Sequence, residues 1–446
     1  MIDVTLLLAV LFGIIILLGL VLFARIQAFI AMLIASIAAG LIAGLSPQSV
    51  ISTVQQGMGS TLGFVAVVVG LGAIFGAILE QSGGAQSLAQ FLLKKFGEKK
   101  ASWALVLTGF FVAIPVFFDV GFIILIPIIY ALQRKSGKSL LVYAIPLLAG
   151  LAITHAFVPP TPGPVAIADI LKVPLGTVIL VGVLVGIPTA IVSGPLFGKF
   201  IGDKIKLEAP TEIEESKDNE NLPSPFQILS IIGLPILLIL CNTLFQSSLV
   251  DVSSMSPSFI SVLQLLGHPF VALIIANLVA WYVLGIRKGY TLDQLQQIST
   301  KSLAPAGVII LLTGAGGVFK QTLINTGAGE MLAQYFASSG INLLVLAFLV
   351  ATIVRVLQGS ATVAMITAAG IVAPILPETL PDLTKAMIVI SIAAGSSMLS
   401  HVNDSGFWLV KEYLGMTEKE TFKSWTVMTT ILGLTGLVAV LILSLI

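Results

Sequence analysis

The sequence carries an internal repeat whose two copies lie about 244 residues apart. Two pairs of segments define it: GLGAIF at 70–75 with GAGGVF at 314–319, and SGGAQSLAQF at 82–91 with TGAGEMLAQY at 326–335. Later in each copy an apolar stretch is interrupted beside a histidine, at His155 and at His401. Duplicated apolar segments with paired polar interruptions are typical of membrane proteins in which two related halves enclose a central site.

The composition indicates a membrane protein and argues against nucleic acid as a partner. Of its 446 residues 57% are apolar and 10% charged, whereas a soluble protein carries roughly 25% charged residues. We therefore expect a multi-pass membrane protein surrounded by lipid. A net charge of +1 gives no reason to expect nucleic acid. Cys241 is the single cysteine, which excludes an internal disulfide and a metal–thiolate cluster, and we expect no metal and no cofactor.

Eight stretches are apolar enough to span a bilayer, which takes about 20 residues each. They are 4–24, 27–45, 62–80 and 177–199 in the first half, and 226–245, 269–285, 304–323 and 424–446 in the second. Two shorter amphipathic stretches, 84–96 and its repeat 327–338, are predicted to lie at the membrane interface.

Two further segments are predicted to be re-entrant hairpins. As one helix, 101–132 would be about 48 Å long, against a hydrocarbon core of about 30 Å, and it is too short for two spans. We place its tip at 115–121 and that of its counterpart, 341–376, at 358–362. Lysines and arginines flank the first hairpin on both sides and are nearly absent beside the second. By the positive-inside rule the first hairpin then enters from the cytoplasm and the second from outside.

The predicted fold is therefore an all-α polytopic membrane protein made of two inverted-topology repeats. Each repeat has a re-entrant helical hairpin and a broken transmembrane helix. The first repeat is assigned to 1–202 and the second to 226–446. Between them, 203–225 is predicted to be a cytoplasmic linker, because 10 of the 43 charged residues lie within 203–220.

Four polar stretches interrupt the apolar pattern: 115–121, 154–164, 358–362 and 400–406. An acid such as Asp119 in the middle of a membrane helix costs roughly 2.5–3.5 kcal/mol on insertion scales, which favours a functional role. The alternatives are a helix cap near the interface for Asp119, ordinary loops for 154–164 and 400–406, and helix packing for 358–362. Four prolines between 159 and 164 favour unwound backbone, which is tolerated at membrane depth where it lines a cavity.

These stretches supply the candidate site residues. The predicted substrate-binding residues are Thr154, His155, Thr161, Gly163, Gln358, Gly359, Ser360, Thr362, Asn403 and Ser405. The candidates for carrying a coupling proton are Asp119, His155, His401 and Asp404. Hydroxyl, amide and imidazole groups, together with helix N-termini at the interruptions, suit an anionic solute rich in hydroxyl groups.

Two charged residues receive a structural interpretation instead. Arg355 either neutralises a substrate carboxylate or lies at the outer membrane interface, and we favour the interface. Glu80, with its neighbour Gln81, is expected to end the third span rather than to bind a ligand. No nucleophile–base spacing stands out, so an enzyme is not expected.

Four segments resemble the gluconate permease family of bacterial proton symporters, and the likeness extends over essentially the whole chain. They are GLGAIFGAILEQSGGAQ at 70–86, IPVFFDVGFIILIPI at 114–128, HAFVPPTPGPVA at 155–166 and SHVNDSGFW at 400–408. The resemblance implies uptake of gluconate or a related small acid, with relatives that carry D-serine or other hydroxy acids. It also implies a homodimer with a scaffold and a mobile transport part.

The sequence thus predicts a secondary active transporter of the bacterial inner membrane that takes up a small anionic hydroxy acid with a coupling proton. Sodium stays open as the coupling ion in place of the proton, because hydroxyl groups and the carbonyls of broken helices are also sodium ligands. A passive channel or facilitator is the alternative from another class. It would equilibrate the solute without concentrating it.

Overall fold

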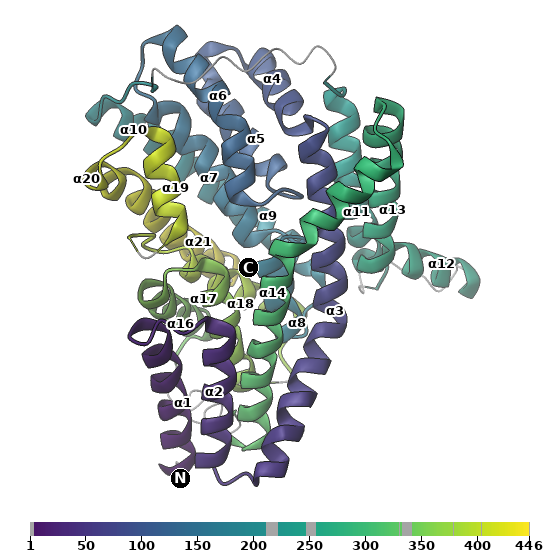
Figure 1. Ribbon diagram of the computed structural model, residues 1–446, viewed down its shortest axis with the longest axis vertical. Helices are drawn as coiled ribbons and strands as arrows, with labels where there is room; N and C mark the ends of the chain where they lie inside the picture. The colour runs from purple at the N-terminus through teal and green to yellow at the C-terminus, as the bar shows by residue number, and fades with distance from the viewer. Residues whose placement is uncertain are drawn as a thin grey trace.

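The computed structural model describes residues 4–210, 222–246, 256–329, 331, 341–377, 379–402 and 404–445. All regular secondary structure in these ranges is helical (Figure 1). Seven segments in the described part of the chain are long and apolar enough to cross a membrane. The prediction of an all-α, multi-pass membrane protein is confirmed.

The first half begins with two apolar helices and continues through a long helix to a hairpin and a broken helix. Its elements are α1 (Val4–Leu22), α2 (Ala28–Ile42), α3 (Pro47–Gln81), α4 (Gly84–Phe96), α5 (Ala101–Val112), α6 (Phe118–Ser136), α7 (Leu141–Phe157), α8 (Pro162–Ile170), α9 (Leu175–Ile191) and α10 (Phe197–Lys204). A π-helical turn, Val192–Leu196, joins the last two. The helix predicted over 84–96 is α4, with the same bounds.

The second half also contains a long helix that is followed by a helix–turn–helix segment and a broken helix. Its elements are α11 (Pro225–Gln246), α12 (Pro257–Gly267), α13 (Pro269–Ala280), α14 (Leu292–Asn325), α16 (Leu343–Gln358), α17 (Ala361–Val372), α18 (Asp382–Ser396), α19 (Ser405–Leu414), α20 (Glu418–Thr421) and α21 (Val427–Leu443). Most of the predicted interfacial stretch 327–338 and part of the predicted linker lie outside the described residues. The division into two membrane domains stays a prediction.

The two long helices α3 and α14 are equivalent in the repeat, and they pack side by side in opposite directions (Figure 1). At one end the Asn325 amide donates to the Thr53 hydroxyl at 2.8 Å, and at the other the Tyr290 hydroxyl donates to the Gln81 carbonyl at 2.9 Å. Gly57 allows the close approach, because a Cβ there would lie 2.6 Å from Cα of Val318. Opposite directions for equivalent helices are what an inverted repeat requires.

These two helices are longer than the spans predicted at 62–80 and 304–323. They contain 35 and 34 residues, which is about 50 Å of helix each. Their polar first halves lack the hydropathy of a span, and for that reason the sequence pattern missed them. Helices of this length must tilt or extend beyond a hydrocarbon core of about 30 Å.

Helix–turn–helix segments lie at both predicted hairpins, as α5–α6 and α16–α17, but only α16 and α17 pack closely on each other, whereas α5 packs chiefly on α7. The first tip is shorter than expected: α6 already begins at Phe118, so Asp119 lies in its first helical turn rather than in the loop. The second tip turns at Gly359, whose φ of +90° favours glycine, and Ser360 then caps α17 by accepting from the Val363 N–H.

Both broken helices are present, with shifted boundaries. α7 continues to Phe157, so Thr154 and His155 are helical, and only 158–161 is unwound before α8. The break falls at Pro159 because proline lacks an N–H and disfavours helical backbone in the residue before it. In the second half α18 ends at Ser396 and α19 begins at Ser405, with Asp404 as its N-cap.

Candidate functional site

A cavity of about 370 Å³ lies where the two hairpin tips meet the end of α7 and the start of α19. The first turns of α6, α17 and α19 all reach its walls, so three helix N-termini approach the same space. Helix N-termini carry partial positive charge and free N–H groups, which favours an anion in the cavity. α14 and α21 complete the walls.

Arg355 is the cation of this cavity. It is 3% exposed, and its Nη2 forms an ion pair with Oδ2 of Asp404. Its Nε and Nη1 are buried and have no hydrogen-bond partner among the described residues. Because a guanidinium carries five donors in a planar fork, these unused donors can bind a carboxylate. Our interpretation of Arg355 as an interface residue is contradicted by its burial.

Asp404 holds the second helix interruption together. Its Oδ2 also accepts the Ser400 hydroxyl, and its Oδ1 accepts the Gly406 N–H at 3.1 Å. Ser400 in turn receives the Trp425 indole N–H at 2.6 Å, and its own N–H donates to the Thr429 hydroxyl at 3.2 Å. The arrangement fixes the Asp404 carboxylate beside Arg355 from three directions.

Asp119 and His155 enter the cavity from the first half of the chain. Asp119 is exposed to the cavity, and no ion pair with any described residue holds its carboxylate. His155 lies in the last turn of α7, where its ring contacts the ring of Phe117, with 6.3 Å between centroids. Its buried Nδ1 has no hydrogen-bond partner in the described structure. Proton transfer by either side chain stays a prediction.

Three hydroxyl residues among the predicted ligands also line the cavity: Ser360, Thr362 and Ser405. They stand on the first turns of α17 and α19, on the same side as Arg355. Hydroxyl groups both donate and accept, so they suit the hydroxyls of a polyhydroxy acid. Their function is not tested by the geometry and stays a prediction.

The remaining predicted residues do not line this cavity. Thr161 donates to the Val158 carbonyl at 2.6 Å within the break, while Gly163 makes room for the sulfur of Met365, which a Cβ would approach to 2.7 Å. Gly359 forms the second tip. Thr154 and Gln358 each have a buried side-chain oxygen that has no partner in the described structure. Asn403 lies outside the described residues.

His401 acts behind the cavity rather than in it. Its Nε2 lies 3.0 Å from the carbonyl oxygen of Val356, to which it donates. Val356 follows Arg355 on α16, so His401 links the second helix interruption to the turn that carries the guanidinium. A hydrogen-bonded positioning role fits this place better than proton transfer with a solute.

Sequence reasoning also missed the aromatic walls of the cavity. Phe117, Phe118 and Trp425 line the cavity, and Phe118 faces Trp425 with 5.5 Å between their ring centroids. Nothing in the local pattern marks these residues, since aromatic side chains are common throughout the apolar segments. Arg355 could have been found, because an arginine inside an apolar run is expensive and usually functional.

The chain matches known permeases along its length. Residues 5–446 match the GntP family permease model. A gluconate permease of Pseudomonas aeruginosa is 40% identical over 95% of this chain and 94% of its own length. A low-affinity gluconate transporter of Escherichia coli K12 is 40% identical, over 98% and 97% of the two chains. The L-idonate transporter of the Gnt-II system of the same strain is 37% identical, over 96% and 97%.

Two solved structures share the fold. Neisseria gonorrhoeae MtrF, described as one of a class of antimetabolite efflux pumps, aligns with a TM-score of 0.66 over 95% of this chain and 96% of its own, at 14% identity. The YdaH transporter of Alcanivorax borkumensis aligns with a TM-score of 0.64 over 94% and 98%, at 13% identity. With the matches to relatives, these results show that the chain is a membrane transporter and belongs to the GntP family of permeases.

Proposed function

We propose that this protein is a secondary active transporter that takes up gluconate, or a closely related small hydroxy acid, together with a proton across the bacterial inner membrane. The observation that carries the proposal is the buried guanidinium of Arg355, which lines the cavity with two unused donors. The names of the relatives, gluconate and L-idonate transporters, support a polyhydroxy carboxylate as the solute.

In this proposal the carboxylate of the solute accepts a hydrogen bond from Nε or from Nη1 of Arg355, the two nitrogens that Asp404 leaves free. A charge-assisted hydrogen bond between a guanidinium and a carboxylate is among the stronger hydrogen bonds in proteins. The hydroxyls of the solute then meet Ser360, Thr362 and Ser405. Phe117 and Trp425 close the apolar sides.

The charges in the cavity support the proposal that transport is coupled to a proton. When both carboxyl groups are ionised, Arg355, Asp404 and Asp119 sum to one negative charge. Asp404 is paired with Arg355, whereas the Asp119 carboxylate has no ion pair among the described residues and repels an incoming carboxylate. Protonation of Asp119 removes that repulsion, so binding of the solute and of a proton favour each other. This reciprocal coupling is the basis of symport.

Uptake into proteoliposomes tests the proposal. Labelled gluconate is supplied with and without an inward proton gradient, and with a sodium gradient as the third arm. Accumulation above equilibrium only with the proton gradient is the expected result. Accumulation driven by sodium alone would reassign the coupling ion. Equilibration without accumulation would indicate a facilitator, and no uptake of any hydroxy acid would reject the proposal.

The assembly is proposed to be a homodimer with a scaffold and a moving part, as the family resemblance implies. The antiparallel pair α3–α14 is suited to the scaffold role, because it is long and continuous, while the hairpins and broken helices carry the cavity residues. Mass measurement of the purified protein in lipid nanodiscs checks the oligomeric state.

A further inference from the structure

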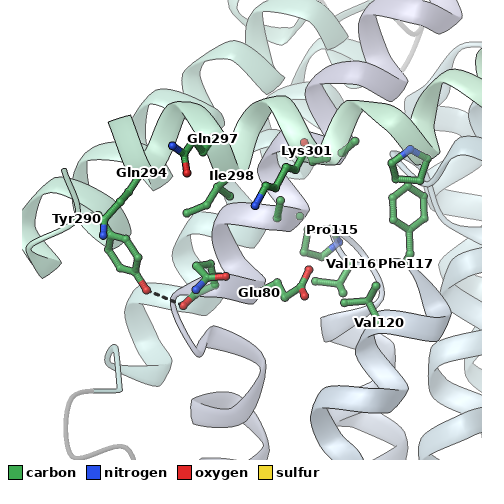
Figure 2. Close-up of a pocket in the computed structure, with 16 residues that line it drawn as sticks. Glu80, Pro115, Val116, Phe117, Val120, Tyr290, Gln294, Gln297, Ile298 and Lys301 are labelled. Carbon is green, nitrogen blue, oxygen red and sulfur yellow. Dashed lines mark hydrogen bonds between the residues drawn. The ribbon is translucent and has the colours of Figure 1, made fainter. Parts of the chain in front are cut away.

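A second cavity of about 450 Å³ lies beside the first, between the end of α3, the first hairpin tip and the first half of α14. Figure 2 shows the charged side chains of Glu80 and Lys301 reaching into it from α3 and α14. The wall also carries several polar side chains, namely Gln81, Tyr290, Gln294, Gln297 and Ser302. Like the central cavity, it combines a basic side chain with a carboxylate and hydroxyl groups.

The two cavities are neighbours. Phe117 and Val120 of the first hairpin tip line both of them, as does Pro305 of α14. A third cavity of about 570 Å³ continues in the opposite direction and shares Gln81 and Tyr290 with the second. It is lined by Arg287 and Lys288. Each cavity in this row therefore presents at least one basic side chain.

The outer end of the row lies on the predicted cytoplasmic side. The third cavity includes Leu222, at the end of the charged linker, and the linker residue Pro223 accepts a hydrogen bond from Ser87 at 2.6 Å. Basic residues cluster there as the positive-inside rule requires of a cytoplasmic end. The second cavity thus lies between the central site and the cytoplasm.

We infer that this second cavity is a separate, weaker binding site for the same hydroxy acid on its way between the central site and the cytoplasm, with Lys301 as the partner of its carboxylate. The inference rests on the proposed function. Among the described residues no hydrogen bond or ion pair occupies the Lys301 ammonium, so it is available to a solute anion.

Glu80 limits the strength of the site. Its carboxylate shares the cavity with Lys301 and repels the carboxylate of the solute. A site that passes a solute onward must bind it weakly enough to release it. Removing the charge of Lys301 and removing that of Glu80 therefore have opposite effects on binding, whereas a merely structural ion pair would give two changes of the same sign.

The test uses the full-length protein in nanodiscs, with Cys241→Ala removing the exposed native thiol. Ile298→Cys places a reactive thiol in the second cavity, and Ala361→Cys places one in the central cavity. Gluconate is the probe, and its protection of each thiol against a charged maleimide is measured as a function of concentration.

Gluconate is expected to protect both thiols. Lys301→Gln should raise the concentration for half-protection at position 298 by roughly tenfold, the effect of one charge-assisted hydrogen bond. Glu80→Gln should lower it, and Lys301→Arg should restore it. Lys199→Gln removes an exposed lysine that lines none of the three cavities and should change nothing. Arg355→Gln should raise the concentration for half-protection about 30-fold or more at position 361 only.

The outcomes separate the two proposals. Protection at position 361 but none at 298 would overturn the second site and leave the proposed function in place. Protection at 298 that is lost with Arg355→Gln and not with Lys301→Gln would also overturn it, because the signal would then report closure around the central site. No protection at either position would reject the proposed function itself. Equal weakening by Lys301→Gln and Glu80→Gln would make the pair structural and overturn the inference.

Discussion

The two hairpins bring side chains of opposite charge to the central cavity. α5–α6 brings Asp119 to the cavity in the first turn of its second helix, whereas α16–α17 brings Arg355 from the last turn of its first helix. The first hairpin carries an acid that has no ion pair among the described residues, here called the acidic arm, and the second carries a cation paired with Asp404, the cationic arm. The two arms thus bring opposite charges to the same cavity.

The largest expected effect comes from the cationic arm. Arg355→Gln should lower the affinity for gluconate about 30-fold or more, because removing one member of a buried, hydrogen-bonded charge pair costs roughly 2–5 kcal/mol. Equilibrium binding to the purified protein measures it. Arg355→Lys keeps the charge but not the fork, and should recover only part of the affinity. Unchanged gluconate binding in the Arg355→Gln variant would contradict the assignment of carboxylate binding to the cationic arm.

The acidic arm should give a different phenotype. Asp119→Asn is expected to abolish proton-driven accumulation while gluconate still binds and exchanges, because the asparagine mimics the protonated acid and no longer couples to pH. Counterflow in proteoliposomes, with equal substrate on both sides, measures exchange without a gradient. Accumulation that persists at normal rate in this variant would assign the coupling proton to another group.

A third substitution tests whether the close contact between α3 and the first hairpin tip holds that tip in place. Gly76→Ala places a Cβ 1.9 Å from the carbonyl oxygen of Pro115, so the tip must shift. Overpacking of this kind costs typically 1–3 kcal/mol, and we expect a lower melting temperature and slower uptake. Gly70→Ala on the same helix is the matched control, since its Cβ would meet only Leu303 at 3.8 Å. Equal behaviour of the two variants would show that the tip is not held by this contact.

His401→Ala should have a smaller effect on the cationic arm. The loss of its hydrogen bond to Val356 loosens the turn that carries Arg355, which predicts a several-fold loss of affinity, since one such bond is worth about 1 kcal/mol. The pH dependence of binding should not change. A shifted pH profile measured by binding titration would return His401 to the proton-carrying candidates.

The ion pair at the base of the first hairpin should matter least. Glu98 and Lys135 are 2.7 Å apart but largely exposed. The hydrogen bond from Lys135, and then its charge, lowers the pKa of Glu98 below its ordinary value. Its contribution is therefore present above the unfolded-state pKa and lost as pH falls through the folded-state pKa. Glu98→Gln should lower the melting temperature slightly at pH 7 and not at pH 3, in contrast with the buried Arg355–Asp404 pair.

Much of the architecture could be predicted from local pattern. The hairpins, the broken helices and α4 follow from segment length, proline placement and charge, all of which act over one or two helical turns. Asp119, His155, Ser360, Thr362, Asp404 and Ser405 line the cavity, and each was marked by being polar within an apolar stretch. Thr161 and Gly163 have the same signature, yet their contacts are internal to the break and to the packing of α8.

The sequence by itself therefore determined that the chain spans a membrane, repeats its unit and breaks its helices at polar points. Burial of backbone groups in lipid leaves few other solutions for such a pattern. Only the tertiary structure decided that Arg355 turns inward to meet Asp404, 49 residues away in sequence. The physical reason is that the direction in which a helix face points is set by the helices packed against it. No local pattern contains those partners.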